Sequence, residues 1–404
     1  MHSIPVGEDA KLPNQMDNHA SNTNPLSFRR RYSDPARFAS DSKLDFLIAF
    51  VTSRCPYDCS FCLYAKQRAA ALSDLSVAEW TQVAAGIGRI HNLVVSGGEP
   101  FVRRDLSQIL RAFVANARVK VVDLPTNGFD PDIIYDRVSE ICETLPEVDI
   151  SLSVSIDGMP ATHDRLRRTN GAFNRAVATL ERVQTLKARF PALVVTAQST
   201  ICRANVSELV EFAEMLRRSA IADFHVFELV RGEIEDLSLL QIDAPLLRRT
   251  YEELFDIQCH YLFQEHPTIS AAEWWARITD IGEIADLYSV QYDTFVQKSP
   301  WPFPCLAGRV SLVLESDGAV RACELRSKLG NVRDASYSVS RIISGLKGTG
   351  ELADIACGGC YCTHVCSLLN SMERSLVRRM HEHPAAGMKA WLNYRSHEKC
   401  SFGN

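Results

Sequence analysis

Residues 44–62 read LDFLIAFVTSRCPYDCSFC. The first part of this stretch is a run of aliphatic and aromatic residues, which is typical of a fully buried strand. Cys55, Cys59 and Cys62 follow that run directly. Because parallel α/β sheets collect their ligands at the carboxyl ends of the strands, this order predicts three thiols on a loop at the functional edge of a sheet.

The next part of the chain repeats the same pattern, a short apolar run followed by an amphipathic stretch, which is typical of βα units around a parallel sheet. The predicted strands are 46–52, 92–96, 119–123, 150–156, 193–200 and 224–229. The predicted helices are 76–90, 106–117, 132–144, 173–188 and 206–218. Six such units predict an α/β fold built as a partial (β/α)6, TIM-like barrel.

Composition and periodicity divide the chain into four parts. Residues 1–43 are rich in Asn, Ser, Asp and Pro and show no hydrophobic period, so they are predicted to be a disordered arm. Residues 44–235 hold the βα units, and 236–300 are predicted to be a helical connector. Residues 301–404 form a small cysteine-rich part that begins with a hairpin, because Asp-Gly between two apolar runs favours a turn with positive φ.

Three closely spaced cysteines without a fourth suit an iron–sulfur cubane. They can hold three irons and leave the fourth iron open, whereas a structural zinc site uses four ligands. An open iron can bind a substrate or a cofactor. Spacing alone leaves two other interpretations open: a zinc site completed by a distant ligand, and three unrelated core thiols.

Further motifs follow the predicted strands in order. Ser96-Gly97-Gly98-Glu99-Pro100 comes after the second strand, Thr126-Asn127-Gly128 after the third, and Ser153 to Gly158 on the fourth, with His163, Asp164 and Arg168 behind it. Together with the Cx3Cx2C loop, these motifs resemble the radical S-adenosylmethionine (SAM) superfamily over residues 44–232. The resemblance implies that the three loop cysteines hold a [4Fe-4S] cluster whose open iron binds SAM.

The resemblance also implies which residues bind SAM. Glu99 is expected near the cationic amine, and the two preceding glycines are expected to let the backbone approach the methionine part. Phe61 is expected to pack near adenine. Ser199 and Thr200 are further candidates for hydrogen bonds to SAM. The predicted SAM-binding residues are Phe61, Gly97, Gly98, Glu99, Asn127 and Ser155.

A second group of cysteines lies near the C-terminus. Cys305 and Cys323 flank the predicted hairpin, and Cys357, Cys360 and Cys366 follow with C-x2-C-x5-C spacing. This arrangement resembles the SPASM or twitch extension, which implies at least one auxiliary iron–sulfur cluster held by these five thiols.

The sequence departs from the full SPASM pattern, because Asn370 stands where a further cysteine is expected. One possible ligand set joins Cys400 to the last three cysteines, and another joins Cys305 and Cys323 to the first two of them. Zinc is an alternative metal, since four thiolates also suit it. Cys362 and His364 are interpreted as bystanders.

Composition excludes several classes of protein. The 404 residues carry a net charge of −5, which gives no basic field for nucleic acid. No apolar run approaches the roughly 20 residues of a membrane span, and Met1 to Asn24 has no apolar core of the signal-peptide type. Thirteen cysteines without a secretory signal predict metal binding in the reducing cytoplasm rather than a disulfide framework.

The resemblance implies an enzyme that cleaves SAM reductively and uses the 5′-deoxyadenosyl radical to take hydrogen from a peptide or small metabolite. A flavodoxin- or ferredoxin-type reductant is the expected partner. Dehydrogenation, epimerisation, cross-linking and rearrangement all stay open. Glu228 and Arg231 are the first candidates for the substrate-side acid or base. The alternative from another class is a non-catalytic iron–sulfur or zinc scaffold.

Overall fold

The structure is a computed structural model that describes residues 44–69, 73–263, 270–358, 360–375 and 377–401. The predicted arm, residues 1–43, lies outside the described residues. So do the side chains beyond residue 395, and with them the candidate ligand Cys400.

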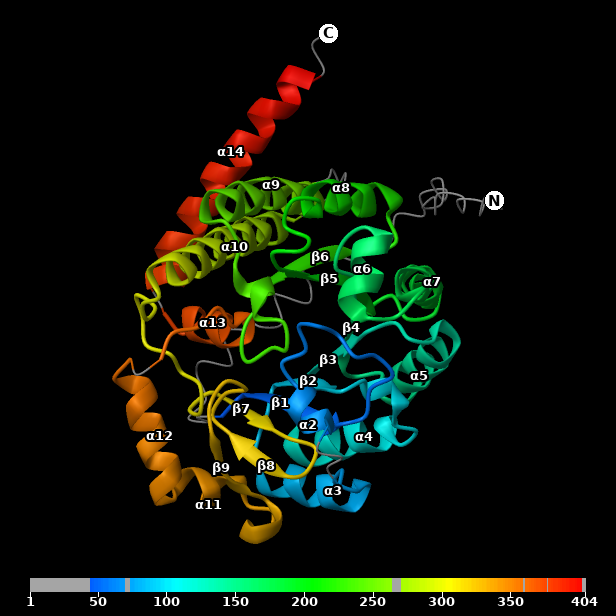
Figure 1. Ribbon diagram of the computed structural model, residues 1–404, viewed down its shortest axis with the longest axis vertical. Helices are drawn as coiled ribbons and strands as arrows, with labels where there is room; N and C mark the ends of the chain where they lie inside the picture. Colours follow the sequence, from blue (N-terminus) through cyan, green and yellow to red (C-terminus); the bar gives the residue numbers. More distant parts are fainter. Residues whose placement is uncertain (1–43, 70–72, 264–269, 359, 376, 402–404) are drawn as a thin grey trace, which may run out of the picture.

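Six parallel strands form the centre of the fold (Figure 1), and each pairs with the next along the chain. They are β1 Phe46–Thr52, β2 Asn92–Gly97, β3 Val121–Thr126, β4 Asp149–Ser155, β5 Val194–Ile201 and β6 Phe224–Leu229. Within the described residues β6 is an edge of the sheet, so the barrel does not close. The predicted α/β fold with a partial barrel is confirmed.

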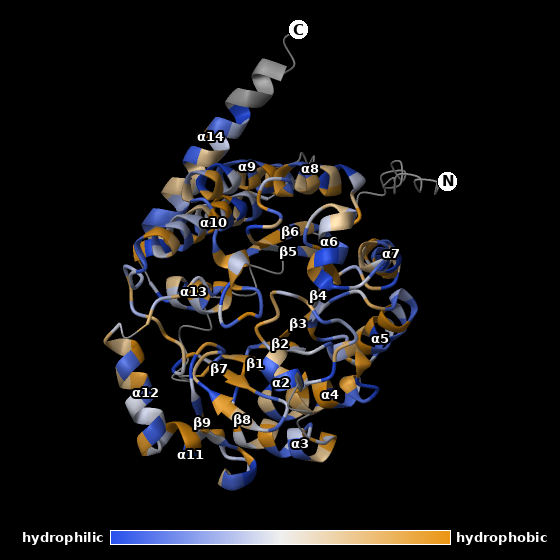
Figure 2. Ribbon diagram, viewed as in Figure 1, coloured by the Kyte–Doolittle hydropathy of each residue, from blue (hydrophilic) through white to orange (hydrophobic). Residues whose placement is uncertain are grey.

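Helices follow the strands and cover the outside of the barrel. They are α3 Val77–Gly86, α4 Leu106–Ala117, α5 Pro131–Thr144, α6 Pro160–Arg167, α7 Ala172–Gln184 and α8 Leu209–Ser219. The start of α3 is set by a capping box, in which the side chains of Ser76 and Glu79 each accept a hydrogen bond from the other's backbone N–H. Figure 2 shows that the sheet is mainly hydrophobic, as expected of strands covered on both faces.

The first strand is buried along its whole length. Leu47, Ala49 and Val51 join the main core beneath the helices. Phe46, Ile48 and Phe50 belong to a smaller cluster on the other face, toward the barrel interior, where Ile48 and Phe50 line the central cavity. A continuous apolar run was therefore needed at this strand, because one face builds the core and the other lines the site.

The third strand runs further than predicted, because the prediction stopped before Pro125. Proline lacks the N–H that a central strand donates. Here β2 pairs with β3 only as far as Asp123, so Pro125 pairs on one side alone, with Ser153 of β4. The strand can therefore continue to Thr126, which brings Asn127 to the functional edge.

The predicted hairpin is present as β7 Ser311–Leu314 and β8 Ala319–Arg321, and β9 Lys328–Asn331 follows it. These strands extend the barrel sheet itself, because β7 lies parallel to β1, with Phe46 opposite Ser311. The strand order is β6-β5-β4-β3-β2-β1-β7-β8-β9. The cysteine-rich part is thus joined to the barrel through backbone hydrogen bonds, and its loops lie beside the loop that follows β1.

Two long helices connect the barrel to this region, α9 Ala244–Phe263 and α10 Ala271–Gln297. The remaining helices are α2 Ala65–Ala69, α11 Val339–Ser344, α12 Leu346–Ala356, α13 Val365–Met372 and α14 His383–Ser401. Helix α14 crosses α10 closely, since a Cβ at Gly282 or Gly387 would overlap the backbone of the facing helix. No helix among the described residues is both long and apolar enough to span a membrane.

Candidate active site

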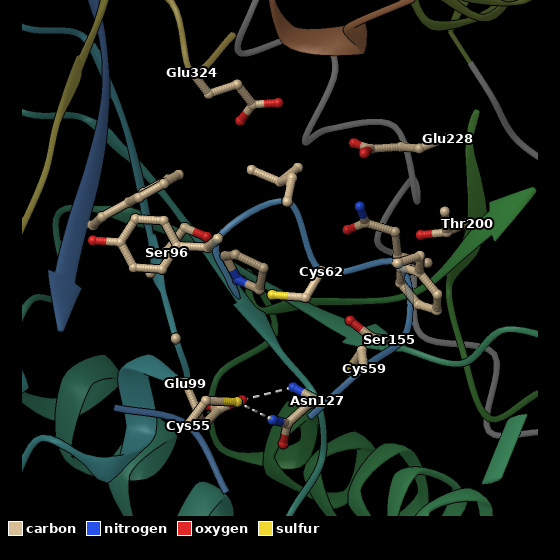
Figure 3. Close-up of a pocket in the computed structure, with 18 of the residues that line it drawn as sticks. Cys55, Cys59, Cys62, Ser96, Glu99, Asn127, Ser155, Thr200, Glu228 and Glu324 are labelled. Carbon is tan, nitrogen blue, oxygen red and sulfur yellow. Dashed lines mark hydrogen bonds between the residues drawn. The ribbon is translucent and has the colours of Figure 1, made fainter. Parts of the chain in front are cut away.

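The three loop cysteines line a cavity inside the barrel. Cys55, Cys59 and Cys62 all line it, and its volume is about 260 Å³. Figure 3 shows Cys55 at the end of the cavity that holds Glu99 and Asn127, with Cys62 nearer its middle. Every predicted SAM-binding residue lines the same cavity, namely Phe61, Gly97, Gly98, Glu99, Asn127 and Ser155.

Hydrogen-bond donors surround the cysteine sulfurs. The Asn127 side-chain amide donates to Cys55 Sγ at 3.4 Å, and the Arg167 guanidinium donates to Cys59 Sγ at 3.8 Å. Burial raises the pKa of the Cys55 thiol to about 12, and the pKa of Cys59 is raised for the same reason. Thiols with donors aimed at sulfur, as at Cys55 and Cys59, fit a cationic metal cluster, whose charge favours the thiolate form.

Among the described residues, no three histidine, cysteine or acidic side chains converge closely enough to hold a single metal ion. A cubane cluster sets a different requirement, because each thiolate binds a different iron.

The two glycines at the end of β2, Gly97 and Gly98, are required by a backbone contact. A Cβ at Gly97 would lie 2.4 Å from the Thr52 carbonyl oxygen, and one at Gly98 would lie 2.1 Å from that of Arg54. Gly98 N donates to Thr52 O and Glu99 N to Arg54 O, both at 2.8 Å. Because only glycine leaves room for this contact, the two glycines allow the segment to hydrogen-bond to the start of the cysteine loop, which brings Glu99 beside the loop. This role differs from the predicted one, in which the glycines let the backbone approach a ligand.

Glu99 is a buried carboxylate held by three donors. The Asn127 backbone N–H donates to it at 2.7 Å, the Thr126 hydroxyl at 2.9 Å and the Phe101 backbone N–H at 3.2 Å. Burial nevertheless raises its pKa to about 7. A cation placed beside such a group is strongly favoured, because it removes the cost of an unpaired buried charge.

Sequence reasoning missed a buried ion pair behind Cys59. Arg167 Nε donates to Asp157 Oδ2 at 2.7 Å, and its guanidinium lies 5.1 Å from the centre of the Phe61 ring. Although burial opposes ionisation, Arg167 and His163 hold the pKa of Asp157 well below its usual range. The helical spacing of His163 and Arg167 could have indicated this pair. Arg168, which the motif singled out, instead pairs with Glu235 at the surface.

The two candidates on β5 for hydrogen bonds to SAM, Ser199 and Thr200, lie on opposite faces of the strand. Thr200 lines the cavity, as does Ser155 at the end of β4 (Figure 3). Ser199 points away, because its hydroxyl contacts His225 Nε2 at 2.8 Å and donates to the Ile156 carbonyl. Alternation along the strand therefore removes Ser199 from the SAM candidates.

The opposite end of the cavity is ionic. Arg231 bonds Glu228 and Glu324 at 2.7 and 2.8 Å, and both carboxylates point into the cavity in Figure 3. Asp123 also lines it, and burial raises the pKa of this carboxyl to about 7. We call Asp123, Glu228, Arg231 and Glu324 the ionic end of the cavity.

The structure does not bring the predicted auxiliary cysteines together as one set. Cys366 lines the central cavity beside the ionic end. Cys305, Cys357 and Cys360 line a separate hollow of about 400 Å³ together with Cys362. Cys323 is buried, with its sulfur 3.7 Å from His364 Nδ1.

A second groove, of about 710 Å³, adjoins the central cavity. The two share walls formed by Leu63, Val230, Arg231 and Glu324. Arg231 and Glu324 therefore line both the groove and the ionic end of the cavity.

Comparison with known proteins matches the sequence model of the Radical SAM superfamily to residues 50–216. PqqA peptide cyclase of Rhizobium meliloti is 30% identical over 304 residues, which cover 72% of each chain. An AdoMet-dependent heme synthase of Methanosarcina barkeri is 35% identical over 199 residues, 47% of this chain. The chain spans 53% of that synthase and 46% of the pre-heme d1 synthase of Dinoroseobacter shibae, about half of each.

Solved structures share the fold. The anSMEcpe structure with bound AdoMet has a TM-score of 0.53 at 15% identity and covers 87% of this chain and 96% of its own. Streptococcus suis SuiB bound to precursor peptide SuiA has a TM-score of 0.54 at 14% identity and covers 93% and 81%.

Fold, site and relatives define a SAM-dependent iron–sulfur enzyme. The chain belongs to the radical SAM superfamily, as its motifs predicted. Members of this superfamily bind a [4Fe-4S] cluster and SAM.

Proposed function

We propose that this enzyme takes a hydrogen atom from a peptide or small-metabolite substrate held at the ionic end of the central cavity. The observation that supports the proposal is that one cavity joins the cysteine loop, the buried Glu99 and the ionic end. A substrate placed there lies between the cofactor site and the adjoining groove.

Cys55, Cys59 and Cys62 are proposed to hold the cluster, and Glu99 the amine of SAM. The bound cofactors supply an electron and the 5′-deoxyadenosyl radical made by reductive cleavage of SAM. The chain itself orients the bound cofactors and the substrate, and it excludes water from the cavity. Asn127 fixes Cys55 and Glu99 at once through its side chain and backbone N–H, and Arg167 does the same for Cys59 and Phe61.

A peptide substrate is favoured among the open classes. PqqA peptide cyclase is named for a peptide, and SuiB was solved with a precursor peptide. The groove of about 710 Å³ beside the cavity is proposed to receive the part of the peptide that does not react. Glu228 and Arg231 remain the first candidates for the substrate-side acid or base, although Arg231 already holds Glu228 as an ion pair.

The C-terminal part, residues 301–404, is proposed to carry at least one auxiliary cluster, and residues 44–235 the SAM chemistry, with 236–300 as their connector. A flavodoxin- or ferredoxin-type protein is proposed as the reductant. A cytoplasmic location stays a prediction.

The test is anaerobic reconstitution of the wild type and of a Cys55/Cys59/Cys62→Ala triple variant, followed by counts of iron and sulfide and an assay of 5′-deoxyadenosine with SAM and dithionite. We expect nucleoside from the wild type alone, and about four irons retained in the variant. If the wild type makes no nucleoside or binds zinc instead, the protein is a metal-stabilised scaffold and the proposal fails.

A further inference from the structure

The described cysteines between Cys305 and Cys366 are grouped in space differently from their grouping along the sequence. Cys305 precedes β7, Cys323 follows β8, and Cys360 and Cys362 lie on the loop before α13. Three of these four, Cys305, Cys360 and Cys362, line one hollow. The fourth, Cys323, is buried behind the same loop, where its sulfur meets His364 two residues after Cys362.

We propose, on the basis of the function above, that Cys305, Cys323, Cys360 and Cys362 hold the auxiliary iron–sulfur cluster, and that Cys366 belongs to the substrate cavity. Cys362 thereby takes the ligand position that the C-x2-C-x5-C spacing assigned to Cys366.

The four thiols lie close to one another. Cys305, Cys360 and Cys362 line one hollow, and Cys323 is near enough to Cys305 and Cys362 to interact with both electrostatically. Thiols gathered in this way suit a cationic cluster, which binds them as thiolates.

The surroundings of this group also suit a cluster. The hollow has apolar walls, which include Trp301, Phe303 and Tyr361. Trp301 Nε1 donates to the Cys362 carbonyl at 2.7 Å, so the loop that carries the ligand is anchored. Arg326 lies near Cys360, where its positive charge offsets that of thiolates.

Cys366 is separated from this group by two buried side chains. His364 contacts Cys323 through Nδ1, and its Nε2 lies 3.5 Å from Glu324 of the ionic end. Cys366 instead packs against the interior cluster that contains Phe46 and Ile48, and it lines the central cavity together with Glu324. Its place in the first turn of α13 turns it toward the barrel, while Cys362 precedes the helix and faces the hollow.

Cys357 provides a matched control. It is exposed at the end of α12, at the rim of the same hollow, and the family spacing favours it as a ligand. The proposal excludes it.

The experiment adds single serine substitutions to the Cys55/Cys59/Cys62→Ala triple variant, in which only the auxiliary cluster remains. Iron, sulfide and the electron paramagnetic resonance signal of the dithionite-reduced protein are measured after anaerobic reconstitution. Cys362→Ser should lose most of the roughly four irons and the signal, whereas Cys366→Ser and Cys357→Ser should retain both. Loss in Cys366→Ser or Cys357→Ser with retention in Cys362→Ser would overturn the ligand set.

A second measurement avoids substitutions that prevent folding. The reconstituted wild type is alkylated anaerobically with iodoacetamide before and after removal of its clusters with chelator, and each cysteine is quantified by mass spectrometry. Cys357 should react at once, and Cys360 and Cys362 only after cluster removal. Early reaction of Cys362 would contradict the proposal.

These outcomes are distinct from failure of the proposed function. A protein that makes 5′-deoxyadenosine but loses its auxiliary irons with Cys366→Ser keeps the function and refutes the ligand set. A protein that holds zinc at these four cysteines refutes the auxiliary cluster.

Discussion

The cysteine loop after β1 and the C-terminal cysteine region bring their thiols together in different ways. The first takes all three thiols from eight consecutive residues, Cys55 to Cys62, at the end of one strand. The second draws its thiols from three segments that meet only because β7 and β8 extend the barrel sheet. A local motif can therefore be read from spacing, whereas an assembled one depends on topology.

The largest expected effect tests whether SAM chemistry belongs to the first region alone. Cys59→Ser should lower the rate of 5′-deoxyadenosine formation at least about a thousandfold, which corresponds to about 4 kcal/mol of activation free energy. Cys360→Ser should leave nucleoside formation with dithionite measurable, because it removes only an auxiliary ligand. An equal loss of 5′-deoxyadenosine formation in both variants would show that SAM cleavage depends on both regions.

The buried ion pair behind Cys59 is expected to decide the stability of the first region. Arg167→Met should lower the free energy of unfolding by about 3–5 kcal/mol, because it removes the guanidinium that pairs with the buried Asp157 carboxylate. Arg168→Met is the matched control, since its exposed pair with Glu235 is worth about 0–1 kcal/mol. Thermal or urea unfolding of the cluster-free protein measures both, and similar losses would show that burial is not the cause.

Two glutamates should give pH dependences of opposite sign. The pKa of Glu99 is raised to about 7 by burial, so the unfolded chain releases this proton earlier and the folded state loses stability as the pH rises from about 4.5 to 7. The pKa of Glu324 is lowered because Arg231 and His364 outweigh its burial, so it adds stability above about pH 4.5 that is lost as the pH falls.

Urea unfolding of the cluster-free protein across this pH range measures both contributions. Glu99→Gln should remove a loss of stability on the order of 3 kcal/mol. Asp123, whose pKa is also raised to about 7, should still give the variant a slope of the same sign. Glu324→Gln should reduce stability at neutral pH. Slopes of the same sign for the two glutamates would contradict this assignment.

The smallest expected effect is on SAM affinity, and it tests which end of the cavity binds SAM. Glu99→Gln should weaken SAM binding about 10- to 100-fold, the range of one charge-assisted hydrogen bond. Glu228→Gln, at the ionic end, should change SAM affinity by no more than about twofold. Equilibrium dialysis with labelled SAM on reconstituted protein is the measurement. A large effect of Glu228→Gln would mean that SAM extends to the ionic end.

The sequence was most informative where the chemistry is local. The strand before Cys55 and the Gly97-Gly98-Glu99 segment were recognisable because each lies within a few residues of a strand end. Arg167 escaped notice, because its partner Asp157 and its neighbour Cys59 are distant in sequence and only α6 brings them together. Ser199 stayed a candidate beside Thr200 in the sequence, because one residue along a strand reverses the face of the side chain and only the structure shows which of the two faces the cavity.

By itself, the sequence determined the superfamily, the parallel barrel and the candidate ligands of the first cluster, since hydrophobic periodicity and short motifs act over one or two elements. Only the tertiary structure decided that β7 pairs with β1, that Cys362 faces the other auxiliary cysteines, and that Cys366 lines the central cavity. The physical reason is that strand pairing and helix packing set which side chains meet, and neither is encoded in the spacing of the cysteines.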